Sequence, residues 1–115
     1  MKTLRRMFAL MLCLMLVSFV PALAQDDMPL IGIIQLVEHP ALDDARLGFI
    51  EGLKELGFED GKNIRIDYRN GQASKDILAS IADHFIAENV DLVLAIATDA
   101  ATSMASKTTS IPILA

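Results

Sequence analysis

The chain has 115 residues, of which 53% are hydrophobic, and it carries 15 acidic against 10 basic residues, a formal net charge of −5 at pH 7. This length fits one small domain. An acidic surface is a poor partner for nucleic acid or anionic lipid, so we expect binding to neither. A single cysteine cannot form a disulfide within the chain, so the fold must depend on its apolar core.

The first 24 residues have the features of a secretory signal peptide. Three basic residues precede an apolar run over residues 7–17, and Pro21 and the small-residue pattern Ala-Leu-Ala at residues 22–24 follow. A membrane-spanning helix is the alternative, but Pro21 and the cleavage pattern come too early for one. We therefore expect a mature chain that starts at Gln25, lies in the periplasm and does not insert into the membrane. Cleavage removes three basic and no acidic residues, which leaves a net charge of −8.

The mature chain begins with a strand, a helix and a second strand. Residues 30–37 (LIGIIQLV) form a short apolar run without alternation, which is typical of a strand covered on both faces. Residues 41–56 place apolar side chains at helical spacing, and Gly57 is expected to end this helix. Residues 63–69 (NIRIDYR) alternate apolar and charged side chains, which predicts a half-exposed strand towards a sheet edge.

The second half continues the alternation. Ser74 is expected to cap a helix that carries an apolar stripe. Residues 91–97 (DLVLAIA) predict another buried strand. Thr98 is expected to cap a short helix that runs to about Lys107. Residues 111–115 (IPILA) begin a fourth strand. This order predicts an α/β fold, with a parallel Rossmann-like sheet and flanking helices. Because the chain stops inside a predicted strand, we expect it to be the front part of a longer protein.

Ligands of such sheets bind at the carboxyl ends of the strands. Gln35 is a polar residue near the end of the first apolar strand, and a buried amide needs partners, either in a neighbouring loop or in a bound solute. Glu38 and His39 follow, and Pro40 suits the first position of a helix and keeps the residues before it extended. His39 can therefore face a ligand, or it can simply cap the helix while Glu38 is solvated.

The other two loops at this edge carry fewer distinctive groups. Thr98 places a hydroxyl beside the free N–H groups of a helix start, where a carboxylate is stabilised, although helix capping is its commoner role. Asp99 suits an ammonium group if it faces the crevice, and is a good first-turn residue if it faces outwards. Asn70 can belong to a polar lip or to an ordinary turn. His84 lies opposite the apolar stripe of its helix and is expected to be solvated.

No catalytic or metal-binding pattern is present in the sequence. There is no metal-ligand spacing, no G-x-S-x-G and no G-x-G-x-x-G after the first strand. We therefore expect no enzyme activity, no cofactor and no metal.

Two stretches, IGIIQLVEHPALDDARLGFIEGLKELGFEDGKNIRIDYRNGQ and VDLVLAIATDAATSMASKTTSIPIL, resemble the substrate-binding proteins of ABC importers. The similar proteins are periplasmic binding proteins of the type that includes tryptophan- and tyrosine-binding members. The resemblance covers essentially the whole mature chain. It implies a type I periplasmic binding protein fold, in which two lobes close on a small solute, and residues 25–115 would form the N-terminal lobe, incomplete at its C-terminus.

The resemblance also implies the ligand and the partner. The solute would be an amino acid, possibly aromatic, or a similar small molecule, delivered to the membrane permease of an ABC importer. Its contacts would come from Gln35, Glu38, His39 and Thr98, with Asn70 and Asp99 beside them. Asp99 departs from the family pattern, which has a proline or a small neutral residue there. The alternative is the ligand-binding ectodomain of a sensory receptor, which uses the same lobes.

Overall fold

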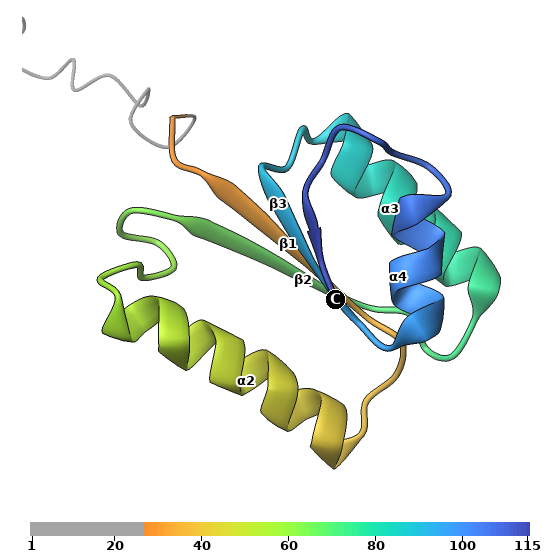
Figure 1. The fold of residues 1–115 in the computed structure, drawn as a ribbon, viewed down its shortest axis with the longest axis horizontal. Coiled ribbons are helices and arrows are strands. Elements are labelled where there is room, and N and C mark those ends of the chain that lie inside the picture. Colours follow the sequence, from red (N-terminus) through yellow and green to blue (C-terminus); the bar gives the residue numbers. More distant parts are fainter. Residues whose placement is uncertain (1–26) are drawn as a thin grey trace, which may run out of the picture.

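The structure is a computed structural model that describes residues 27–115, so the predicted signal peptide lies outside the described residues. Within residues 27–115, three helices and four strands follow one another in the order β1 (Leu30–Gln35), α2 (Pro40–Glu55), β2 (Arg65–Asn70), α3 (Lys75–Ala87), β3 (Leu92–Ile96), α4 (Thr98–Ala105) and β4 (Ile113–Leu114). All strand pairs are parallel, and the sheet order is β2-β1-β3-β4 (Figure 1). The predicted α/β fold with a parallel sheet is confirmed, with element ends shifted by at most two residues.

The sheet separates two apolar layers. Helix α2 covers one face, and α3 and α4 lie together on the other (Figure 1). Strand β1 is central and all six of its residues are buried, as the unbroken apolar run predicts. Ile33 packs towards α2, whereas Ile34 packs towards α3 and α4, and both are 0% exposed. Successive side chains of β1 therefore pack into opposite apolar layers, as expected for a strand covered on both faces.

Strand β2 lies at an edge of the sheet, as its alternating sequence predicts. Ile64, Ile66 and Tyr68 pack into the layer under α2. Asp67, between them in sequence, instead contacts His84 of α3 on the opposite face. The strand is thus apolar on one side and charged on the other, and an edge strand with charged side chains is protected against pairing with another chain.

The ends of the helices follow from local chemistry. Pro40 occupies the start of α2, where its missing N–H costs nothing, and Gly57 follows the helix with φ of +92°, a conformation that favours glycine. Ser74 caps α3 by accepting a hydrogen bond from the Ile77 N–H at 3.3 Å. The predictions for Gly57 and Ser74 are confirmed.

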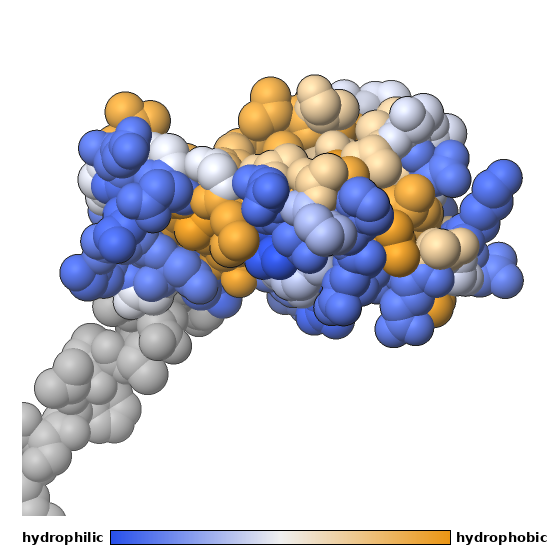
Figure 2. All heavy atoms as spheres, turned by 90° about the horizontal axis from the view of Figure 1, so that it is seen from below, coloured by the Kyte–Doolittle hydropathy of each residue, from blue (hydrophilic) through white to orange (hydrophobic). Residues whose placement is uncertain are grey.

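Much of the surface seen from below in Figure 2 is hydrophilic, with hydrophobic residues exposed between the charged ones. Among the described residues, Leu56 is the most exposed of the large hydrophobic side chains, at 76%. Within residues 27–115, no helix combines the length and the apolar character that crossing a membrane requires.

Candidate functional site at the carboxyl edge of the sheet

The carboxyl ends of β1, β2 and β3 meet at one edge of the sheet. Gln35, the last residue of β1, pairs with Asn70 of β2 on one side and with Ile96 of β3 on the other. The three following loops therefore leave from the same edge, where a solute can contact all of them. They are tied to one another, since the Gly71 N–H donates to the Gln35 carbonyl at 2.7 Å and the Leu36 N–H donates to the Ile96 carbonyl at 3.2 Å.

Gln35 is completely buried, and its amide is bonded by the chain itself. Its Nε2 donates to the Val37 carbonyl and to Asp43 Oδ1, each at 2.8 Å. Its Oε1 accepts from Arg46 Nε at 3.2 Å. The partners that a buried amide requires are therefore the first loop and the start of α2. Direct contact between Gln35 and a solute stays a prediction.

Arg46 completes a network that joins three elements. Its guanidinium lies 3.5 Å from Asp43 Oδ1 and 4.2 Å from the centre of the Tyr68 ring, a cation–π geometry. The Tyr68 hydroxyl is buried and has no hydrogen-bond partner in residues 27–115. We refer to Gln35, Asp43, Arg46 and Tyr68 as the Gln35 network. It links β1, α2 and β2 directly beneath the first loop.

Glu38 and His39 lie on that first loop, and both are exposed. His39 is the N-cap of α2, with extended backbone angles, and its Nδ1 accepts a hydrogen bond from the Ala41 N–H at 3.2 Å. Because Nδ1 accepts, the neutral ring carries its proton on Nε2, which can donate to a ligand. Capping and ligand binding are therefore compatible roles for His39.

The second loop uses Asn70 to shape a turn. Its Oδ1 accepts from the Gln72 N–H at 2.8 Å, which is the usual local bond of an asparagine in a turn. Gln72 and Ala73 follow with positive φ of 52° and 55°. Gly71 is buried against Leu78 so closely that a Cβ would lie 2.4 Å from its side chain. The loop is held in place, and Asn70 has a structural role whether or not it also contacts a solute.

The third loop differs from its prediction. Helix α4 begins at Thr98, its N-cap is Ala97, and no side chain makes a capping hydrogen bond, so the expected capping by Thr98 is wrong. The physical reason is the backbone of Ala97, which has φ of 84° and ψ of 154° and turns the chain one residue earlier. Thr98 and Asp99 are both exposed in the first turn. Their side chains are therefore free to face solvent or a solute.

A shallow hollow of about 360 Å³ lies beside this helix start. Ala97, Thr98, Ala101 and Thr102 line it, together with Ala95 of β3 and with Ala115. Free backbone N–H groups at a helix start attract anions, and threonine hydroxyls can donate or accept. The two threonine hydroxyls and the helix N–H groups are thus the polar part of a lining that is otherwise alanine.

Away from the edge, His84 is only partly solvated, since its side chain is 32% exposed and also contacts β2. His84 Nε2 lies 2.9 Å from Asp67 Oδ2, and Arg69 Nε donates to Asp67 Oδ1 at 2.9 Å. Burial raises the pKa of the Asp67 carboxyl, but the hydrogen bonds and charges of Arg69 and His84 outweigh it and leave this pKa below its ordinary value. The helix pattern placed His84 off the apolar stripe correctly, but it could not show that an edge strand lies there.

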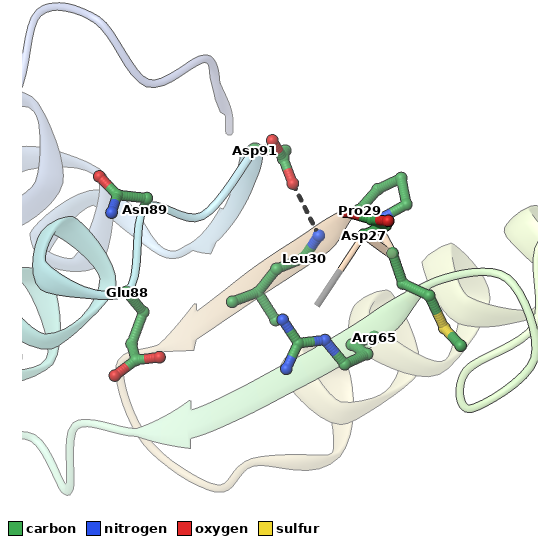
Figure 3. Close-up of a pocket in the computed structure, with 8 residues that line it drawn as sticks. Asp27, Pro29, Leu30, Arg65, Glu88, Asn89 and Asp91 are labelled. Carbon is green, nitrogen blue, oxygen red and sulfur yellow. Dashed lines mark hydrogen bonds between the residues drawn. The ribbon is translucent and has the colours of Figure 1, made fainter. Parts of the chain in front are cut away.

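Sequence reasoning also missed a hollow at the opposite, amino edge of the strands. It has a volume of about 410 Å³ and is lined by Arg65, Glu88, Asn89 and residues that lead into β1 and β3 (Figure 3). Asp91 Oδ2 accepts from the Leu30 N–H at 2.8 Å, and Arg65 Nε is buried without a partner in the part of the chain that the structure describes. The available signal was Arg65 at the start of the predicted edge strand, on the same side as Asp67 and Arg69.

Three solved structures match this fold over 76% of the chain. A ligand-free, open structure of a substrate binding protein with adhesive properties from Clostridium difficile has a TM-score of 0.74 at 47% identity, with 30% of its own chain covered. A conserved domain protein from Vibrio cholerae has a TM-score of 0.74 at 42% identity, again with 30% covered. An ABC domain in complex with L-Trp from Streptococcus pneumonia has a TM-score of 0.72 at 36% identity, with 29% covered.

A curated relative and a family model agree with the structures. The tyrosine-binding protein of Clostridioides difficile (strain R20291) is 46% identical over 84 residues, which are 73% of this chain and 24% of that protein, so the chain spans about a quarter of its relative. The model described as "ABC transporter substrate binding protein" matches residues 30–115. This family consists of binding proteins and not of enzymes, which confirms the prediction of no enzyme activity. The chain belongs to the family of ABC transporter substrate binding proteins.

Proposed function

We propose that residues 25–115 form the first lobe of an extracytoplasmic solute-binding protein, which holds an amino acid between two lobes for an ABC importer. The observation that carries this proposal is the convergence of three loops at one sheet edge, set by the pairing of Gln35 with Asn70 and with Ile96. A site assembled from several loops on a rigid sheet is the usual position for a ligand in an α/β protein.

The groups at this edge match the two ends of an amino acid. Thr98 and the free N–H groups of α4 suit the carboxylate, and the Nε2–H of His39 is a further donor. The exposed carboxylates of Glu38 and Asp99 suit the ammonium group. The names of two relatives support an aromatic side chain, since one is a tyrosine-binding protein and another was solved with L-Trp.

The mechanism that we propose is closure of a second lobe over the solute. The hollow beside Thr98 is shallow and open to solvent, whereas a good site buries roughly 70–90% of a small ligand. A second lobe that closes over this edge would supply the missing contacts, and the ligand would favour the closed state by its additional contacts there. The closed form would then be recognised by the membrane permease.

Location follows from the predicted signal peptide. Cleavage after Ala24 would release a mature chain with a net charge of −8 into the periplasm, without direct membrane insertion. N-terminal sequencing of the protein purified from its host would show whether the mature chain starts at Gln25.

The ligand can be identified directly. The full-length protein would be purified from its host without denaturation, and the solutes it retains would be identified by mass spectrometry. We expect L-tyrosine or L-tryptophan, confirmed by calorimetric titration of the protein after removal of the solute. A retained sugar or metal would contradict the amino-acid proposal.

The two-lobe mechanism has a separate test. Residues 25–115, once shown to be folded by circular dichroism, should give no detectable calorimetric heat with either amino acid. Micromolar binding by this part alone would contradict the requirement for a second lobe.

A further inference from the structure

We infer that Asp43 and Arg46 are positioning residues for the solute, which act through Gln35 on the loop of residues 36–39. The inference rests on the proposed function, because it assigns this loop to the solute. Neither residue needs to contact the solute. Asp43 and Arg46 instead fix the positions of Glu38 and His39.

The first step is the bond between Gln35 and the loop. Gln35 is 0% exposed, and its Nε2 donates to the Val37 carbonyl at 2.8 Å. This bond holds the first peptide groups after β1 against the body of the lobe. The extended residues Glu38 and His39 begin immediately after the held carbonyl, so their position depends on it.

The second step is the way in which α2 holds Gln35. Asp43 Oδ1 accepts from Gln35 Nε2, and Arg46 Nε donates to Gln35 Oε1. Asp43 and Arg46 also pair with each other, so their charges balance beside a buried amide. Hydrogen bonds to charged groups are stronger than neutral ones, and linked bonds reinforce one another. The orientation of the Gln35 amide is therefore fixed from both of its ends.

The third step is the anchoring of Arg46 itself. Its guanidinium lies over the Tyr68 ring of β2, and its side chain is only 19% exposed. Arginine has a planar group that stacks and donates at once, which lysine cannot reproduce. The Gln35 network therefore connects the first loop to both β2 and α2. Binding groups must be held within about 0.5 Å of their working positions, and this network is the support that does so for Glu38 and His39.

A pair of substitutions separates positioning from stability. Gln35→Glu places a carboxylate against Asp43 and against the Val37 carbonyl, and so removes both Nε2 bonds. Adding Asp43→Asn exchanges the amide and the carboxylate of the pair, which restores the bond between positions 35 and 43. It leaves the Val37 carbonyl without its donor. The double variant should therefore recover part of the stability lost in Gln35→Glu without recovering the position of the loop.

The experiment uses the full-length protein and three measurements. Urea unfolding reports stability, calorimetric titration with L-tyrosine and L-tryptophan reports affinity, and hydrogen exchange of the peptide over residues 36–43 reports the order of the loop without any ligand. In the double variant we expect an unfolding midpoint between those of Gln35→Glu and the parent protein, because the bond to position 43 returns while the Val37 carbonyl stays without its donor. We expect affinity to be about 3- to 10-fold weaker and exchange to be faster by a similar factor, the effect of one lost hydrogen bond.

A matched control comes from the opposite edge of the sheet. Asp91→Ala removes the bond to the Leu30 N–H, and so should lower stability without changing affinity or exchange at residues 36–43. Return of affinity and loop protection together with stability in the double variant would overturn the inference, and so would a Gln35→Glu variant that keeps both. If the parent protein binds neither amino acid, the proposed ligand is wrong, while hydrogen exchange still decides the role of the network.

Discussion

Replacing Ala97 with glycine should stabilise the protein, although glycine usually weakens it. Ala97 has φ of 84° and ψ of 154°, a region of backbone conformation that is essentially restricted to glycine. A residue held there costs of order 1–3 kcal/mol. Glycine relieves this strain but adds about 0.5–1 kcal/mol of backbone entropy. Loss of one partly buried methyl group costs up to about 0.8 kcal/mol more. The net expectation is about 1 kcal/mol of added stability.

The assay is urea unfolding of the full-length protein, followed by circular dichroism, with Ala95→Gly as the matched control. Ala95 is 4% exposed in β3 and its φ is not positive, so the same change there has no strain to relieve and should destabilise by about 1–2 kcal/mol. The two variants should therefore move in opposite directions. If Ala97→Gly destabilises the protein as much as Ala95→Gly, the backbone at position 97 is not strained and the explanation for the start of α4 fails.

Three further outcomes follow from the structure. Tyr68→Phe should leave stability unchanged or raise it by up to about 1 kcal/mol in thermal unfolding, because the removed hydroxyl is buried without a partner among the described residues. A loss of stability greater than about 1 kcal/mol would instead reveal a hydrogen bond to that hydroxyl. Gly71→Ala should destabilise by about 1–3 kcal/mol in urea unfolding, since the new Cβ would overlap Leu78; unchanged stability would show that Leu78 can move aside. The depressed pKa of Asp67 means that its stabilising contribution is present above its ordinary pKa and is lost as pH falls through the lower, folded-state value. Asp67→Asn should therefore reduce the loss of stability between about pH 4 and pH 2, measured as unfolding midpoints across this range, and identical profiles would contradict the assignment.

The fold could be predicted from the sequence because its signals are periodic and local. The apolar run that became β1, the helical stripe of α2 and the alternation of β2 each depend on residues within one element. Gly57 and Ser74 act within a single helical turn, so their roles were also visible. A parallel sheet with its loops at one edge then follows from the order of the elements.

The details of the candidate site could not be predicted, because they depend on contacts between elements. The sequence shows that Gln35 needs partners, but only packing shows that Asp43 and Arg46 are those partners. His84 was expected in solvent because a helical pattern does not reveal the neighbouring face of β2. Alanine carries no signal for positive φ, so the turn at Ala97 and the consequent start of α4 could be found only in three dimensions.

The two edges of the sheet differ in a way that bears on function. At the carboxyl edge, both ends of the buried Gln35 amide are hydrogen-bonded by the chain, and the exposed Glu38 and His39 lie on the loop that Gln35 holds. Polar groups that are exposed to solvent but held by a rigid support can bind a ligand without first reorganising. At the amino edge, Asp91 is bonded to the backbone of β1 and Arg65 Nε has no partner among residues 27–115. The carboxyl edge also receives the three loops that follow β1, β2 and β3, which is why we propose solute binding there although the hollow at the amino edge is of similar size.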